Sequence, residues 1–249
     1  MHYFFLENHA LIESNEAELA NEDINHAYRV LRLKAGDNIV VADGHGFARQ
    51  AVITISEPER VQVRFGVEIP SAESSLQIIL FQALAKGEKM DLVIRQAVEL
   101  GVKRIVPVIT RRAIPRWKSG QEEKKLWRWR SIVRSAAAQC RRSYLPQVEN
   151  LHNFEDVLLR FIGYRVLVPW EDATSVPILK ELKQPCPDDQ AVFLLVGPEG
   201  GFSSKEIDDI VQVGARIVHL GPRIMRTETA AIAAISIIQA MWGDLSGKG

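Results

Sequence analysis

The sequence has few cysteines, no long apolar run and no excess of one charge, and each shortage excludes a class of protein. Its 249 residues include only Cys140 and Cys186, which allow at most one disulfide and no cysteine-ligated metal cluster. The longest apolar stretch, residues 230–242, is interrupted by Ser236 and Gln239 and is too short to span a bilayer. No basic group precedes the apolar residues at the start, so no secretory signal is indicated and a cytoplasmic protein is expected.

The balanced charge of the whole chain hides an uneven distribution. Residues 1–72 carry 6 Lys and Arg against 11 Asp and Glu, whereas residues 103–144 carry 13 Lys and Arg against only Glu122 and Glu123. Three tryptophans are interleaved with this basic segment, namely Trp117, Trp127 and Trp129. Such a segment is typical of a surface that binds phosphates and stacks on bases. The same pattern also fits a solvated helix whose tryptophans belong to the core.

The first 70 residues predict a small β-rich domain. Apolar runs at 38–42 and 48–55 flank Asp43-Gly44-His45-Gly46, which favours a hairpin turn. Residues 60–69 alternate apolar and polar positions, as a half-buried strand does. A short helix is expected over 25–33, and the proline-led polar stretch 70–75 is the best linker candidate. We therefore place one domain at residues 1–72 and a second at 73–249.

The second domain alternates strands with helices. Strands are expected over 76–84, 105–109, 165–169, 191–196 and 217–220, and helices over 88–100, 121–142, 203–213 and 227–242. Ser203 and Glu206 form a capping box at the start of the third helix. This alternation predicts an α/β fold with a mostly parallel sheet and helices on both faces.

Two polar, glycine-containing segments follow strands, where an open α/β sheet binds its ligands. The first, residues 197–203, reads Gly-Pro-Glu-Gly-Gly-Phe-Ser, and its glycines let a ligand approach the backbone closely. It has neither the lysine of a phosphate-binding loop nor the glycine spacing of a dinucleotide-binding fold. A nucleotide hydrolase is therefore disfavoured, although a tight turn without a ligand would also need such glycines.

The second segment, residues 220–229, reads Leu-Gly-Pro-Arg-Ile-Met-Arg-Thr-Glu-Thr and leads into the last helix. This segment contains two arginines, two threonines and a glutamate. Thr227 or Thr229 could cap the helix, and Glu228 could favour its N-terminus, but these roles explain only some of the five polar residues.

These two segments, together with three others, resemble the SPOUT (α/β-knot) RNA methyltransferases. The further matches are Lys86-Gly87-Glu88-Lys89-Met90-Asp91 with residues 97–102, Gln139-Cys140 with Arg142 before Pro146, and His26 with residues 29–32 and Gly36. Within that superfamily the chain is similar to the bacterial family that methylates N3 of a uridine in 16S ribosomal RNA. Arg111-Arg112-Ala113 departs from that family's Glu-Arg-Ser, and Ala138-Gln139-Cys140-Arg141-Arg142 departs from its Glu-Gln-Cys-Gly-Arg.

The resemblance implies a trefoil-knotted C-terminal SPOUT domain preceded by a PUA-like RNA-binding domain. It further implies S-adenosyl-L-methionine as cofactor, no metal, a homodimer, and 16S ribosomal RNA within the small subunit as partner. The residues it implies for the cofactor are Leu195, Val196, Gly197, Pro198, Glu199, Gly200, Gly201, Leu220, Gly221, Ile224, Met225, Arg226 and Thr229. For RNA it points to His26, Arg29 and Arg32, with Lys86 and Lys89 as further candidates. The charge of the basic helix adds four arginines that are expected to follow the RNA backbone, namely Arg128, Arg130, Arg134 and Arg142.

The chemistry of uridine methylation assigns three candidate catalytic residues. N3 of uracil is a poor nucleophile until its proton leaves, so Glu228, or a water that it holds, is the expected proton acceptor. Arg226 would stabilise negative charge on the flanking oxygens and would orient the base together with Thr227. Loss of the proton directly to water is the alternative. Alternatives for the whole protein are methylation of another RNA and a non-catalytic RNA-binding factor in ribosome assembly.

Overall fold

The computed structural model describes residues 1–6, 14–113, 120–171, 175–186 and 191–247. Trp117 of the basic segment therefore lies outside the described residues. The chain divides into two compact units: residues 1–73 with 134–145, and residues 74–133 with 146–249. The boundary expected after residue 72 lies one residue from the first of these breaks. The return of residues 134–145 to the first unit was not expected from the sequence, because it depends on contacts between distant segments.

The first unit contains a five-stranded sheet in the order β1-β3-β4-β5-β2. The strands are β1 (His2–Phe5), β2 (Glu16–Glu18), β3 (Asn38–Ala42), β4 (Ala48–Glu57) and β5 (Arg60–Ile69). The expected hairpin joins β3 and β4, and Asp43 closes its turn by accepting hydrogen bonds from the backbone N–H groups of His45 (2.7 Å) and Phe47 (3.1 Å). Strand β1 pairs with β3 in parallel.

The single short helix expected over residues 25–33 is instead an α-helix followed by a wider turn. Helix α2 (Asn21–Asn25) continues into η1 (His26–Val30), a π-helical segment. Ile24 and Ala27 of this pair pack into the core that the sheet forms with Ile39, Val41 and Val63. The segment therefore covers one face of the first unit's sheet.

The second unit contains an eight-stranded sheet in the order β11-β13-β10-β12-β6-β7-β8, with β9 also paired to β7. Its strands are β6 (Ile78–Ala83), β7 (Arg104–Ile109), β8 (Gln147–Val148), β9 (His152–Asn153), β10 (Arg165–Pro169), β11 (Val176–Pro177), β12 (Val192–Val196) and β13 (Arg216–His219). Every pairing in this sheet, over the residues described, is parallel, which confirms the expected sheet.

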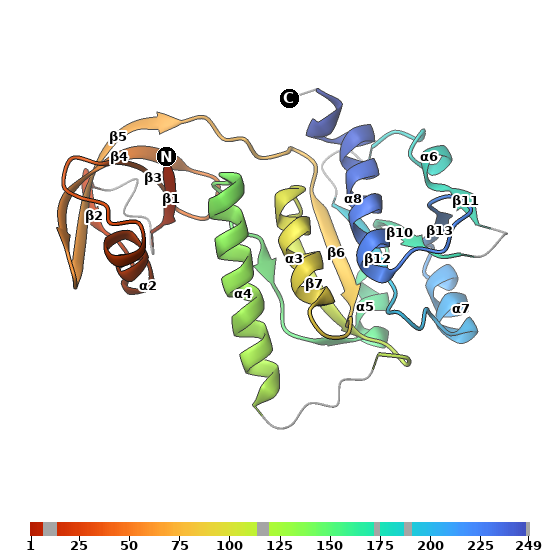
Figure 1. The fold of residues 1–249 in the computed structure, drawn as a ribbon. Helices are drawn as coiled ribbons and strands as arrows, with labels where there is room; N and C mark the ends of the chain where they lie inside the picture. Colours follow the sequence, from red (N-terminus) through yellow and green to blue (C-terminus); the bar gives the residue numbers. More distant parts are fainter. Residues whose placement is uncertain (7–13, 114–119, 172–174, 187–190, 248–249) are drawn as a thin grey trace. The chain divides into compact units, whose positions relative to one another are not determined.

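Helices cover both faces of this sheet (Figure 1). Helices α5 (Phe154–Arg160) and α7 (Ser204–Gln212) share one core with the sheet, in which Phe161, just after α5, meets Phe81 of β6 edge-on at 5.0 Å between ring centroids. Helices α3 (Lys89–Glu99) and α8 (Thr227–Trp242) pack together on the opposite face. The remaining helices are α4 (Gln121–Cys140), α6 (Ile178–Glu181) and the 3₁₀ turn η2 (Asp244–Ser246).

The strand order places the C-terminal ends of β13, β10 and β12 side by side. Both polar segments singled out in the sequence leave from this edge, one after β12 and one after β13. Across the described ranges, no helix is long and apolar enough to cross a membrane.

Candidate ligand-binding and catalytic site

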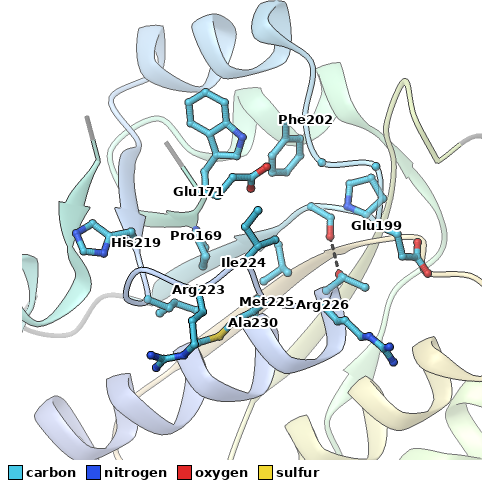
Figure 2. Close-up of a pocket in the computed structure, with 18 of the residues that line it drawn as sticks. Pro169, Glu171, Glu199, Phe202, His219, Arg223, Ile224, Met225, Arg226 and Ala230 are labelled. Atoms are coloured by element: carbon cyan, nitrogen blue, oxygen red, sulfur yellow. Dashed lines mark hydrogen bonds between the residues drawn. The ribbon is translucent and has the colours of Figure 1, made fainter. Parts of the chain in front are cut away.

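A cavity of about 660 Å³ opens at the C-terminal ends of β10, β12 and β13 (Figure 2). The loops that follow these three strands form its walls, together with one residue of α3. The lining residues are Lys89, Pro169, Trp170, Glu171, residues 196–202, residues 219–227 and Ala230. The rule that ligands bind at this edge of a parallel sheet is thus met by three neighbouring strands.

The loop after β12 is a tight turn that leads directly into a capped helix. The N–H of Gly201 donates to the carbonyl of Pro198 at 2.9 Å, and Gly201 has a φ of +66°, which favours glycine. A Cβ on Gly197 would lie 3.0 Å from the ring of Phe202. Ser203 then begins α7, and the capping box with Glu206 is present as expected. A side chain at Gly197 would therefore require the Phe202 ring to shift.

The loop after β13 exposes its backbone to the cavity. Gly221 has a φ of +110°, and a Cβ there would meet no atom within 4 Å. Among the described residues, no hydrogen bond joins the backbone of Leu220, Ile224 or Met225 to another group. Buried or half-buried backbone groups normally have partners, so these N–H and C=O groups are available to a ligand. Ile224 also lines the cavity, although 82% of its surface is exposed.

Thr227 joins the two loops at the start of α8. Its hydroxyl donates to the carbonyl of Gly197 at 2.6 Å and accepts a hydrogen bond from Nε2 of the fully buried Gln82 at 3.1 Å (Figure 2 shows the first bond as a dashed line). A hydroxyl has one proton, which here is used within the protein. The geometry therefore makes Thr227 a link between the walls, and its expected role in orienting a substrate base stays a prediction.

Three charged side chains meet where the cavity borders α3. Lys89 Nζ lies 3.0 Å from Glu199 Oε1 and 3.9 Å from Glu228 Oε2. Burial raises the pKa of the Glu199 carboxyl, but the backbone N–H of Lys86 and the ammonium of Lys89 outweigh burial, and the pKa lies below its ordinary value. Glu199 is therefore ionised at neutral pH, and its contact holds Lys89 against the cavity.

Glu228 occupies the first turn of α8, beside the cavity but not on its surface. Its side chain is 13% exposed, and its Oε2 is a buried oxygen without a hydrogen-bond partner in the described part of the chain. This oxygen lies 3.9 Å from the Lys89 ammonium, and without a hydrogen bond it keeps the capacity to hold a water or a polar group of a ligand. Arg226, the residue just before α8 begins, is exposed and lines the cavity.

The cavity is lined by the residues expected to hold a cofactor, apart from Leu195 and Thr229. Leu195 is fully buried in the core beneath α5 and α7, and it points to the face of the sheet opposite Val196. Thr229 is exposed on α8. Pro169, Trp170 and Glu171 also line the cavity but were not expected from the sequence. Pro169 ends β10 and the other two follow it, so a search of the residues at the end of every strand would have found them.

Two of the arginines expected to bind RNA are instead used inside the first unit. Arg142 forms an ion pair with Glu73 at 2.7 Å, and their side chains are only 7% and 9% exposed. Arg134 donates to Asp23 Oδ2 at 2.5 Å and to the carbonyl of Phe5 at 2.8 Å. The positive charge of these two side chains therefore stabilises the first unit, and their assignment as RNA contacts stays a prediction.

The remaining residues expected to bind RNA lie at the surface. Arg128 is paired with Asp91 of α3, and Arg130 donates to Asn150 Oδ1 at 3.2 Å. His26, Arg29, Arg32 and Lys86 are exposed, and Arg32 has a φ of +55°. Over the described residues, no group of three His, Cys, Asp or Glu side chains is placed to hold a metal ion.

Models of two known protein-domain families match this chain. The model of an RNA methyltransferase domain matches residues 72–239, and that of an RNA methyltransferase PUA domain matches residues 19–66. Ribosomal RNA small subunit methyltransferase E of Buchnera aphidicola is 33% identical over 229 residues, covering 92% of each chain. The protein of that name from Bacillus subtilis is 26% identical over 247 residues, covering 96% of each.

Solved structures show the same fold. Ribosomal RNA small subunit methyltransferase E from Neisseria gonorrhoeae, bound to S-adenosyl methionine, aligns with a TM-score of 0.86 and 32% identity over 98% of this chain and 99% of that one. A putative methyltransferase from Legionella pneumophila, in complex with the same cofactor, aligns with a TM-score of 0.86 and 32% identity over 97% and 98%.

Proposed function

The chain belongs to the family of RNA methyltransferases that includes ribosomal RNA small subunit methyltransferase E, and we propose that it methylates N3 of a uridine in 16S ribosomal RNA with S-adenosylmethionine as methyl donor. The observation that carries this proposal is the cavity at the ends of β10, β12 and β13, with its exposed backbone groups on one side and its charged cluster on the other.

The cavity suits an adenosyl sulfonium ligand. Apolar side chains such as Pro169, Leu220 and Met225 supply surface for a planar base, and the backbone groups of Leu220 and Met225 supply hydrogen bonds for its edge. The carboxylates of Glu171 and Glu199 also line the cavity and complement positive charge on a sulfonium or an α-ammonium group. A β-carbon on Gly197 would lie 3.0 Å from the Phe202 ring, so glycine lets the loop and this ring pack closely.

When bound, S-adenosylmethionine supplies a methyl group that is already activated by its sulfonium sulfur. The protein must then hold the uracil in line with that methyl group and remove the proton from N3. We propose that Glu228 accepts this proton, because its buried Oε2 has no hydrogen-bond partner among the described residues. Arg226 lies within reach of the same cavity, and its guanidinium stabilises the negative charge that develops on O2 and O4 of the base.

We propose further that the active form is a homodimer. Helix α8 is apolar along most of its length, and Met241 at its end is 40% exposed. Ile224, at 82% exposure, forms part of a cavity wall that a second copy would cover. We also propose a trefoil knot, which the resemblance to the SPOUT family supports. We propose a cytoplasmic location as well, which fits the small number of cysteines and the action of the relatives on ribosomal RNA.

The decisive experiment combines cofactor binding with mapping of the modified base. Titration calorimetry should show micromolar binding of S-adenosylmethionine to the purified protein. Small ribosomal subunits treated with protein and cofactor should then acquire one methylated uridine that stops reverse transcription, because N3 lies on the Watson–Crick edge. Methylation that persists when that uridine is replaced by cytidine would contradict the N3 assignment. Absence of cofactor binding, with and without ribosomal RNA, would favour a non-catalytic assembly factor.

A further inference from the structure

Helix α4 presents a large aromatic side chain to solvent. Trp127 is 70% exposed, whereas Trp129, two residues later on the same helix, is 2% exposed and belongs to the core. No ring contact or hydrogen bond of Trp127 is found within the described part of the chain. The sequence allowed two interpretations of the tryptophans in the basic segment, core packing and contact with nucleic acid. Trp129 packs in the core, whereas core packing does not explain the exposed Trp127.

Cations flank Trp127 on its own side of the helix. Lys124 and Arg130 stand three residues before and after it, a spacing that places side chains on neighbouring positions of a helix surface. Lys124 has no ionic partner among the described residues, and Arg130 donates only to neutral oxygens, the Asn150 amide at 3.2 Å and the Val148 carbonyl at 3.4 Å. Glu123, four residues before Trp127, is the nearest acidic residue on that side. The positive charge of both cations thus stays available.

The same stretch of α4 is tied to the border of the cavity. Arg128, next to Trp127, donates to Asp91 Oδ2 at 2.8 Å. Asp91 stands two residues after Lys89, which lines the cavity and contacts Glu199. The residue next to Trp127 therefore connects α4 to α3, whose first residue, Lys89, lines the cavity.

We propose that Trp127 stacks on an unpaired base of the RNA substrate, with Lys124 and Arg130 contacting the phosphates on either side of that nucleotide. An exposed indole offers its flat face to any base that is not already stacked in a duplex, and flanking cations match the charge of the chain that carries it. Paired bases lack a free face, so the site selects single-stranded RNA. This inference rests on the proposed function, because it names how the RNA of that reaction is held.

The test compares the full-length protein with Trp127→Ala, Trp127→Phe and Lys124→Gln. Binding of a fluorescent 12-nucleotide single-stranded RNA and of a duplex of equal length is measured by anisotropy at several salt concentrations. Leu159→Ala, which truncates an equally exposed apolar residue on α5, is the matched control. Trp127→Ala should weaken single-strand binding by roughly 5- to 100-fold with an unchanged salt slope. Trp127→Phe should recover most of the affinity, and Lys124→Gln should lower the salt slope by about 0.7.

The following outcomes would contradict the stacking of Trp127 on an unpaired base. Equal losses on single strand and duplex, no loss with Trp127→Ala, or an equal loss with Leu159→Ala would remove the stacking role. Wild-type protein that binds neither RNA would do the same. Dissociation of a wild-type dimer into monomers by Trp127→Ala, seen in sedimentation, would assign the surface to a second copy instead. Cofactor binding and methylation by wild-type protein are measured in parallel, so failure of the inference is distinguishable from failure of the proposed function.

Discussion

The hydroxyl of Thr227 lies 2.6 Å from the carbonyl oxygen of Gly197 and donates its proton to it. These residues are 30 positions apart, and the bond fastens the loop after β12 to the start of the last helix. Gln82 of β6, in the middle of the sheet, donates a hydrogen bond to the same hydroxyl through its Nε2. One threonine thus connects two walls of the cavity through its hydroxyl.

We therefore expect Thr227→Val to weaken cofactor binding by about 10-fold or more and to lower the free energy of unfolding by about 1–3 kcal/mol, because a buried hydrogen-bonded pair loses its donor. Thr227→Ser keeps the hydroxyl and should recover most of both losses. Calorimetry and thermal unfolding measure the two effects. Thr229→Val alters an exposed threonine on the same helix and should be close to wild type. A comparable loss there would restore Thr229 to the cofactor site.

Gly221 gives a second test of the cavity wall. Its φ of +110° is strained for any other residue, so Gly221→Ala should cost about 1–3 kcal/mol of stability and should weaken cofactor binding strongly. Gly214→Ala is the matched control, because Gly214 also has a positive φ of +85° and open space around it, but it ends α7 away from the cavity. Similar stability losses with unequal cofactor affinities would support the site. Equal effects on affinity would show that Gly221 acts through folding alone.

Glu228→Gln tests the proton acceptor. An amide of the same shape cannot take the proton, so the methylation rate at saturating RNA should fall about 10²- to 10⁴-fold while cofactor affinity stays near that of wild type. Single-turnover methylation separates the chemical step from binding. Glu199→Gln provides the contrast, since Glu199 contacts Lys86 and Lys89 and should change binding more than the rate. An unchanged rate in Glu228→Gln would assign proton loss to water.

Sequence patterns predicted the features that depend on neighbouring residues. The strands, the capping box of α7 and the glycine turns follow from local conformation, and most of them lie where expected. The position of Leu195 could not be predicted from such patterns. All five residues of β12 are buried, so no alternation in the sequence tells which face of the sheet each side chain meets.

Contacts between residues far apart in the sequence could not be predicted either. The basic segment around α4 was visible from its charge, but Arg142 is neutralised by Glu73, which is 69 residues away, while Arg130 is not paired with any carboxylate in the described residues. Glu171 follows a strand like the other cavity residues, yet only the order of strands in the sheet brings it beside them. Local composition cannot supply either fact.

The Arg142–Glu73 pair leads to a prediction about stability. Because both side chains are nearly buried, Arg142→Ala leaves a carboxylate without its counterion, and we expect a loss of about 3–5 kcal/mol in unfolding free energy. The double variant Arg142→Met with Glu73→Leu should recover much of that loss. Chemical denaturation measures both. If Arg142→Ala were as stable as wild type and reduced the salt dependence of RNA binding, the original assignment of Arg142 to RNA would stand.

Glu149 makes stability depend on pH in a defined direction. Burial raises the pKa of its carboxyl, but two hydrogen bonds from Arg160 (2.8 and 3.0 Å), with Arg104 and His152 nearby, outweigh burial and lower the pKa below the ordinary value of 4.5. A carboxyl with a lowered folded-state pKa stabilises the protein above its unfolded-state pKa, and that stabilisation is lost as the pH falls through the folded-state value. Wild type should therefore exceed Glu149→Gln in unfolding free energy at pH 6, and the difference should shrink steadily below about pH 4.5. Urea denaturation of both proteins between pH 3 and pH 7 measures it. A difference that stayed constant over this range would mean that Glu149 contributes through packing and not through its charge.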